Sequence, residues 1–197
     1  MTLALNKSSL KQQRDQLDLY RKFLPSLDLK RQQLMAALKE AQGRLAEADA
    51  ELRDIDRSVE ELAPLLGGPA LASRDLSQLV HVAEVRVETE NLAGVRVPRV
   101  VEVRFEKAPY STLATPFWLD QFVAILQRAA EARIRHAALA RRVELLQAAS
   151  RRVTQRVNLF EKVLIPQALA DIKRIQIFLA DQERSAVVRS KIAKAKP

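Results

Sequence analysis

Few residues of this chain have the types and spacing that chemistry requires. A phosphate-binding loop needs clustered glycines ahead of a lysine, whereas the four glycines here are scattered. His81 and His136 lie far apart in sequence and cysteine is absent, which argues against a metal site. Ser150 has no base at a spacing that would activate it as a nucleophile. The sequence therefore predicts no catalytic residue, no cofactor and no metal, and we expect a protein that is not an enzyme.

The remaining polar candidates fit structural roles. Glu47 with Glu51, and Asp54 with Asp56, could be taken for paired carboxylates. On an exposed helix, such acids usually form ion pairs with nearby arginines and lysines. His136 falls on an apolar seam of a predicted helix, so we expect it to fill that seam.

The charge of the chain restricts its partners. A net charge of +9 suits an acidic partner, which can be nucleic acid, anionic lipid or an acidic protein surface. The arginine-rich second half lacks interleaved aromatics and finger spacings, so a solvated face or an acidic protein ranks ahead of nucleic acid. No apolar run of about 18 residues predicts membrane insertion. With no signal peptide and no cysteine, we expect a cytoplasmic protein.

The elements that must position these residues are long helices. Every seventh residue from Leu10 to Val59 is apolar except Arg31, and a second series three residues further on, from Gln13 to Leu62, is apolar except at its first member. Two such seams predict a helix that supercoils against a partner helix with a left-handed twist. The Gly67-Gly68-Pro69 segment should end this helix.

The partner helix is predicted in the second half of the chain. It should begin at Thr115-Pro116, with Thr115 as the N-cap and Pro116 as the first helical residue. Its two seams run from Trp118 to Phe160 and from Phe122 to Leu164. Beyond Leu164 the apolar pattern slips, with Pro166 at the slip, which predicts a local change in winding. Antiparallel pairing makes paired residue numbers sum to about 180, so residues beyond Ile175 should extend past the first helix as a cationic end. Pro25 and Pro166 should kink their helices without ending them.

Between the helices the apolar period changes from seven to two. Alternation over about residues 82–105, with Asn91-Leu92-Ala93-Gly94 as the turn, predicts a β-hairpin that packs on the coil or on a partner. The fold class is therefore mainly α: a long antiparallel two-helix left-handed coiled coil with a small β-hairpin and a short loop or helix region between the helices. We expect an N-terminal helix at 1–66, a middle region at 67–115 and a C-terminal helix with a basic tail at 116–197.

Two stretches carry a resemblance to a known family. Residues 91–98, NLAGVRVP, and residues 151–184, RRVTQRVNLFEKVLIPQALADIKRIQIFLADQER, resemble signature stretches of the D subunit of vacuolar/archaeal-type (V/A-type) ATPases and ATP synthases, the central rotor stalk. The opening LNKSSLKQQRDQL and the following LDLKRQQLM are similar to the start of that family. An Ile-Pro pair inside a strong helix is rare in generic coiled coils, so the resemblance is distinctive.

The resemblance implies a non-catalytic rotor shaft that couples ATP hydrolysis or synthesis in a catalytic A/B hexamer to rotation of a membrane ion-translocating ring. It implies two further partners, the F subunit and the C/d membrane-rotor adaptor, and a cytoplasmic location peripheral to the membrane. A prefoldin-like coiled-coil chaperone is the alternative. The residues expected to contact partners lie on the hairpin, on the second helix and in the basic tail: Val85, Val87, Gly94, Val95, Val97, Arg135, Arg142, Arg152, Arg189 and Lys191.

Overall fold

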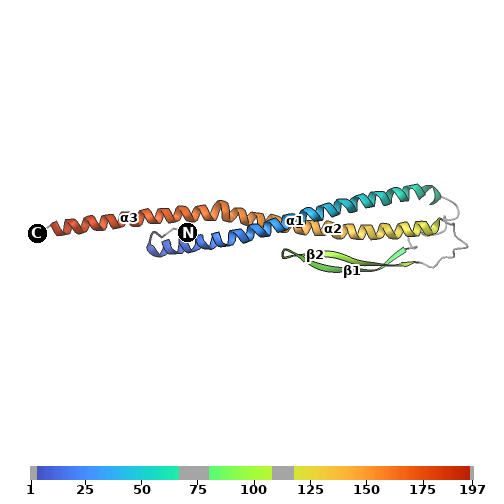
Figure 1. Ribbon diagram of the computed structural model, residues 1–197, viewed down its shortest axis with the longest axis horizontal. Coiled ribbons are helices and arrows are strands. Elements are labelled where there is room, and N and C mark those ends of the chain that lie inside the picture. Colours follow the sequence, from blue (N-terminus) through green and yellow to red (C-terminus); the bar gives the residue numbers. More distant parts are fainter. Residues whose placement is uncertain (1–3, 67–79, 108–117, 196–197) are drawn as a thin grey trace. The chain divides into compact units, whose positions relative to one another are not determined.

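The computed structural model describes residues 4–66, 80–107 and 118–195. Its elements, in chain order, are the helix α1 (Lys7–Leu66), the strands β1 (Val80–Leu92) and β2 (Val95–Lys107), the helix α2 (Leu119–Leu159), the π-helical segment η2 (Phe160–Leu164) and the helix α3 (Ile165–Ala195) (Figure 1). Long helices with a two-stranded antiparallel sheet between them confirm the predicted fold class. Within these described ranges, every helix lacks an apolar stretch of the length and hydropathy needed to cross a bilayer.

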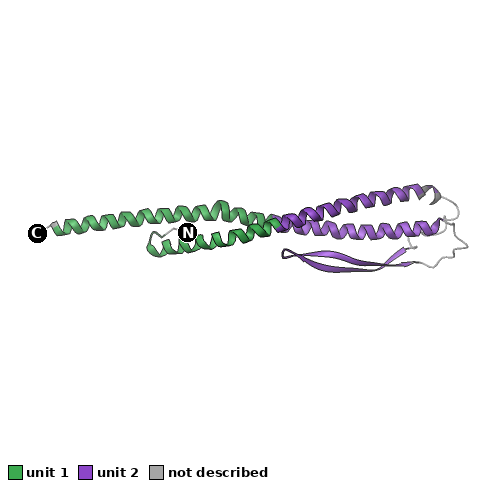
Figure 2. Ribbon diagram, viewed as in Figure 1, with its two compact units in different colours: residues 1–32, 151–197 green, residues 33–150 purple. Residues whose placement is uncertain are grey.

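The chain divides into two compact units (Figure 2). Unit 1 comprises residues 1–32 and 151–197, and unit 2 comprises residues 33–150. The three segments expected from the sequence, 1–66, 67–115 and 116–197, stay a prediction.

The ends of α1 follow local chemistry. The side-chain Oδ1 of Asn6 accepts the backbone N–H of Ser9 at 2.7 Å, so Asn6 caps the helix as an Asx residue does. The helix continues through Pro25 without a break, and the Ser26 hydroxyl donates to the carbonyl of Phe23 at 2.8 Å in the turn where the proline lacks a donor. α1 ends at Leu66; the predicted stop at Gly67-Gly68-Pro69 and the predicted start at Thr115-Pro116 lie outside the described residues.

In unit 1, the predicted seams form the packed interior. Every predicted seam residue of this unit that the structure describes is buried or half-buried, and Ile175 is 0% exposed. Tyr20 of α1 meets Phe160 edge to face, with ring centroids 5.4 Å apart. Their numbers sum to 180, which confirms the antiparallel register. Full burial of a side chain such as that of Ile175 contributes roughly 1.5–3 kcal/mol to stability.

The slip beyond Leu164 coincides with η2. The Ile165 N–H donates to the carbonyl of Phe160, five residues back, where an α-helix would use Glu161. A π-helical turn holds one extra residue, so the seam that reached Phe160 resumes at Ala168, eight residues later. The predicted phase change is therefore confirmed, and its structural form is a π-segment directly ahead of Pro166.

In unit 2, α1 and α2 pack along the same two seams. Leu34, Ala41 and Ile55 of α1 are at most 3% exposed, and Leu146 of α2 is 0% exposed. The Nε2 of His136 lies 2.7 Å from Oδ1 of Asp49 across the helix pair, which confirms that this histidine fills a seam position.

The hairpin of unit 2 closes on a two-residue turn. Ala93 and Gly94 have φ of 50° and 83°, the positive values that a type I′ turn requires, and Oδ1 of Asn91 accepts the Gly94 N–H at 2.9 Å. The predicted turn is confirmed, and the strands extend two residues beyond the predicted 82–105 at each end. The register shifts between Val82 and Glu84 and between Arg86 and Val87, which marks two β-bulges.

Candidate functional site

The last part of α3 has no partner helix among the residues that the structure describes. Every residue from 180 to 194, hereafter the α3 extension, is exposed, whereas Leu179 is half-buried and Ile175 fully buried. This confirms that the chain extends beyond its own helical pairing in unit 1. The extension carries four cations at Arg184, Arg189, Lys191 and Lys194, and two acids at Asp181 and Glu183.

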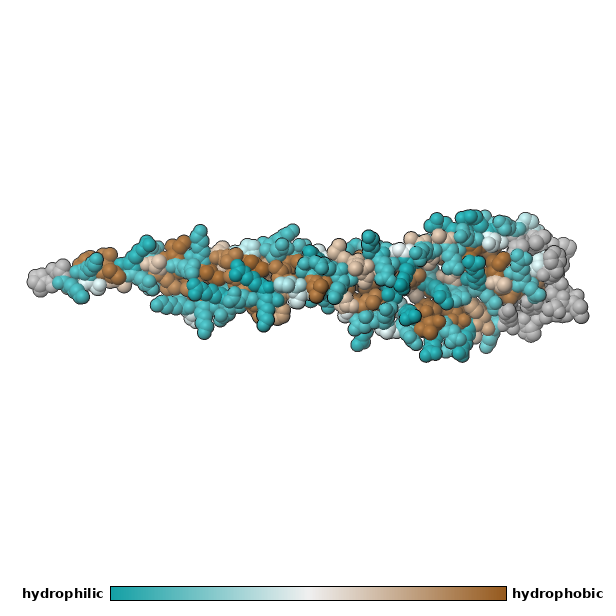
Figure 3. Space-filling view, in the orientation of Figure 1, coloured by the Kyte–Doolittle hydropathy of each residue, from teal (hydrophilic) through white to brown (hydrophobic). Residues whose placement is uncertain are grey.

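Apolar side chains also lie on the α3 extension. Val187, Val188 and Ile192 are each more than half exposed, at 55%, 54% and 57%. Figure 3 shows apolar surface alternating with hydrophilic surface toward this end of α3. A surface that combines cations with large apolar groups is suited to contact with an acidic, partly apolar protein surface.

A second surface is built where the hairpin meets α2 in unit 2. Nη1 of Arg142 donates to Oε2 of Glu90 on β1 at 3.1 Å, and the Arg142 side chain is only 10% exposed. Val97 of β2 is 1% exposed, and Val80 packs against a cluster formed by Trp118, Leu119, Phe122 and Val123. These contacts hold the hairpin against the helix, as predicted for an element that is marginal alone.

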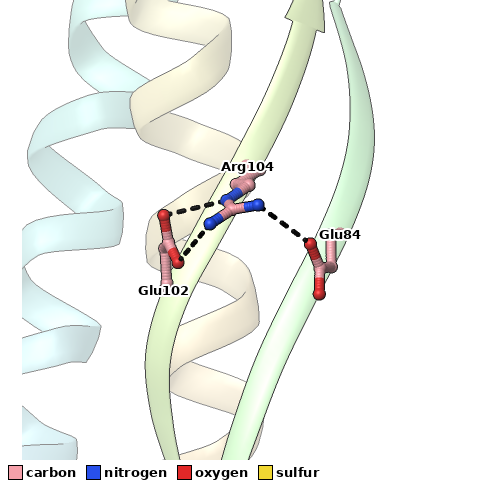
Figure 4. A network of polar contacts seen from close by, with 3 residues as sticks. All are labelled: Glu84, Glu102 and Arg104. Carbon is pink, nitrogen blue, oxygen red and sulfur yellow. Dashed lines mark hydrogen bonds and ion pairs between the residues drawn. The ribbon is translucent and has the colours of Figure 1, made fainter.

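The opposite side of the hairpin remains exposed. Val85 is 37% exposed and Val87 52% exposed. Elsewhere on the hairpin, one arginine and two glutamates form an exposed network of polar contacts (Figure 4). Nε of Arg104 donates to Glu102 at 3.0 Å, and its Nη1 donates to Glu84 on the other strand at 3.4 Å. The hydrogen bond and then the charge of Arg104 hold the pKa of Glu102 below its usual value. The same contacts raise the pKa of Arg104.

The structure places the ten residues expected to contact partners in different environments. Val85, Val87, Gly94, Arg135, Arg152, Arg189 and Lys191 are exposed, and Val95 is half-buried. Val97 and Arg142 are buried and serve the contact between hairpin and helix. The structure brings Arg135 and Arg142 to one groove with Arg44 and Arg99. Contact of any of these residues with another protein stays a prediction.

Three of the four acids considered above as paired carboxylates form ion pairs. Asp54 lies 2.9 Å from Arg57, and Asp56 lies 3.7 Å from Arg133 of α2. Glu51 lies 3.5 Å from Arg128. Among the described residues, no three His, Cys, Asp or Glu side chains gather as metal ligands would.

Sequence reasoning missed the role of Glu90. Its partner Arg142 is 52 residues away, and no local pattern in one sequence links a strand carboxylate to a helix arginine at that separation. The sequence offered only the position of Glu90 just before the turn. The structure adds that Val97, opposite Glu90 on β2, is buried, which shows that this part of the hairpin faces the helix.

Comparison with known proteins agrees with this architecture. A family model described as the ATP synthase D subunit matches residues 9–195. The V-type ATP synthase D subunit of Borreliella burgdorferi is 33% identical over 193 residues, covering 98% of this chain and 94% of the relative. That of Chlamydia muridarum is 34% identical over 194 residues, covering 98% and 95%. These matches confirm the resemblance found in the sequence, and the chain belongs to the ATP synthase D-subunit family.

Proposed function

We propose that this chain is the rotor shaft of a V-type rotary ATPase or ATP synthase. In this role it couples ATP hydrolysis or synthesis in a catalytic A/B hexamer to rotation of the membrane ion-translocating ring. The shaft performs no nucleotide chemistry itself and is peripheral to the membrane through the complex. The observation that carries the proposal is the match to the D-subunit family along nearly the whole chain, joined to an architecture of paired long helices.

The seams support a shaft because torque must pass along it without separating the helices. In each unit, the described seam residues are buried or half-buried, so twisting one helix against its neighbour would expose apolar surface. Close packing of this kind resists small displacements. Stiffness within each unit is therefore a consequence of the heptad pattern.

The α3 extension supports insertion into a partner. Its residues 180–194 are exposed and predominantly cationic, which favours an acidic protein lining such as the bore of a hexamer. The F subunit and the C/d membrane-rotor adaptor are the further partners that we assign to the shaft. The exposed hairpin valines, Val85 and Val87, are available for a protein contact in unit 2.

The absence of cysteine from the sequence makes a direct test possible. The chain should be co-expressed with the hexamer and F subunits carrying Ser185→Cys, in the α3 extension, and a cysteine in the facing hexamer subunit. We expect the complex to co-purify, and oxidation to a crosslink should abolish ATP turnover, because a shaft locked to the hexamer blocks sequential closure of its interfaces. Reduction of the disulfide should restore turnover.

The same complex carrying Ser185→Cys alone is the control and should keep its turnover after oxidation. Failure of the chain to co-purify would contradict the proposal. Full turnover in the crosslinked complex would contradict it as well, since a chain that can be fixed to the hexamer without consequence does not rotate within it.

A further inference from the structure

A groove of about 410 Å³ lies in unit 2 where the hairpin meets the helices. Four arginines from three elements line it: Arg44 of α1, Arg99 of β2, and Arg135 and Arg142 of α2. Glu90 of β1 also lines the groove. Such a convergence of guanidinium groups is the arrangement that proteins use for phosphate and carboxylate groups.

Two of these arginines have unused donors. Arg142 donates one N–H of its Nη1 to Glu90. Its Nε is buried, without an acceptor among the described residues, and has almost no accessible surface, so a ligand in the groove would meet the Nη groups. Arg99 is paired with Glu88 across the strands, yet the Glu88 carboxylate approaches Arg86, at 3.7 Å. The side chain of Arg99 forms no hydrogen bond or ion pair within the described part of the chain.

The other two arginines are partly neutralised. Arg44 lies 2.6 Å from Glu40, and Arg135 lies 2.6 Å from Glu131. Each guanidinium has five N–H donors, so both retain donors after these pairs form. Counting Glu40, Glu90 and Glu131 against the four arginines leaves one net positive charge around the groove.

We propose that this groove binds a phosphate-type oxyanion through Arg99 and the remaining Nη donors of Arg142. The buried position of Arg142 fixes one donor in place before binding, which lowers the entropy cost of recognition. Pro98, Val100 and Leu139 add apolar surface to the lining of the groove. Glu90 orients Arg142, but its charge opposes the anion.

The volume exceeds that of a single phosphate, so the ligand is either the free ion with water or the phosphate group of a nucleotide. Both sources present the same chemistry to the guanidinium groups. The proposal rests on unit 2 alone and does not depend on the rotor role.

The test is isothermal titration of the full chain with potassium phosphate and, separately, with ADP, each at an ionic strength matched with potassium chloride. Arg99→Ala should weaken binding about fivefold through loss of a charge-assisted hydrogen bond. Glu90→Gln should tighten it about threefold or more, because the opposing charge is removed. Arg96→Ala is the matched control, since Arg96 is also an exposed arginine of β2 but does not line the groove, and it should bind as the parent chain does.

Saturable binding of phosphate supports the proposal with the free ion as ligand, and binding of ADP alone supports it with a nucleotide phosphate as ligand. The proposal is overturned if neither binds beyond the chloride control. Equal affinities of the Arg99→Ala and Arg96→Ala chains would also overturn it, because binding would then be a general effect of charge. Circular dichroism of each variant establishes that the helices and hairpin are retained.

Discussion

Replacement of Ile175 by alanine tests how η2 sets the packing of α3. Ile175 is 0% exposed, whereas Ile177, two residues further along the same helix, is 54% exposed. Deleting a fully buried isoleucine side chain to alanine costs about 2–5 kcal/mol, from lost transfer free energy and the cavity that remains. A two-helix seam can partly close around a small side chain, so we expect a loss of about 3 kcal/mol for Ile175→Ala.

Ile177→Ala is the matched control, because it removes the same atoms from an exposed site of the same helix. Exposed substitutions usually change stability by less than about 0.5 kcal/mol, and alanine has the higher helix propensity. The free energy of unfolding should be measured by urea denaturation with far-ultraviolet circular dichroism. Hydrogen exchange of α3 amides should show that the loss in Ile175→Ala arises in unit 1.

The result also decides between two phases of the seam. An uninterrupted seven-residue repeat from Leu164 would bury Phe178, yet Phe178 is 42% exposed while Ile175 is buried. If Phe178→Ala destabilised the protein more than Ile175→Ala did, the extra residue of η2 would not be setting the phase. Equal losses for Ile175→Ala and Ile177→Ala would refute the assignment of this seam altogether.

Two further predictions concern the hairpin. Arg104→Ala should raise the pKa of Glu102 toward its ordinary value, because Arg104 supplies the hydrogen bond and the charge that lower it. A carboxylate whose pKa is lowered by folding stabilises the folded state at pH values above its unfolded pKa, and this stabilisation is lost as the pH falls through its folded pKa. The parent hairpin should therefore lose stability from Glu102 on acidification, and the variant should not. A carboxyl-carbon NMR titration measures the shift, with Arg96→Ala as control. Gly94→Ala should destabilise the hairpin by about 1–2 kcal/mol, because a residue with a Cβ disfavours the φ of 83° found at this position. Ala93→Asn should stabilise the hairpin slightly, because asparagine tolerates the positive φ of this position. Amide hydrogen exchange in the strands should become faster in Gly94→Ala and slower in Ala93→Asn.

The fold was largely predictable because its organisation is periodic. Heptad spacing identifies the residues that meet a partner helix, and even the exception in the first seam, Arg31, is half-buried beside Asp28. The turn was predictable because Asn91 and Gly94 have local backbone roles. In both cases, the residues that form the pattern are separated by only a few positions in the sequence.

The groove at the hairpin was less predictable because its contacts are long-range. The sequence indicates that Arg135 and Arg142 are basic and two turns apart, but not that Arg142 is buried against Glu90. The burial of Val97 follows from the same docking of hairpin on helix, which composition and period do not specify. Identification of a contact surface therefore required the three-dimensional arrangement.

The Ile165-Pro166 pair has a packing explanation in unit 1. Pro166 has no N–H, so an α-helical ladder must lose one bond at this turn, and η2 places its extra residue in the turn directly before it. The two irregularities are adjacent, so the helix is disturbed at one place only. One added residue rotates the following residues by about 100° relative to an unshifted helix. Consequently, η2 fixes which face of α3 lies opposite α1 in this unit, and with it the direction in which the exposed Val188 and Ile192 of the α3 extension point. Without η2, a partner of the α3 extension would meet a different face of the helix.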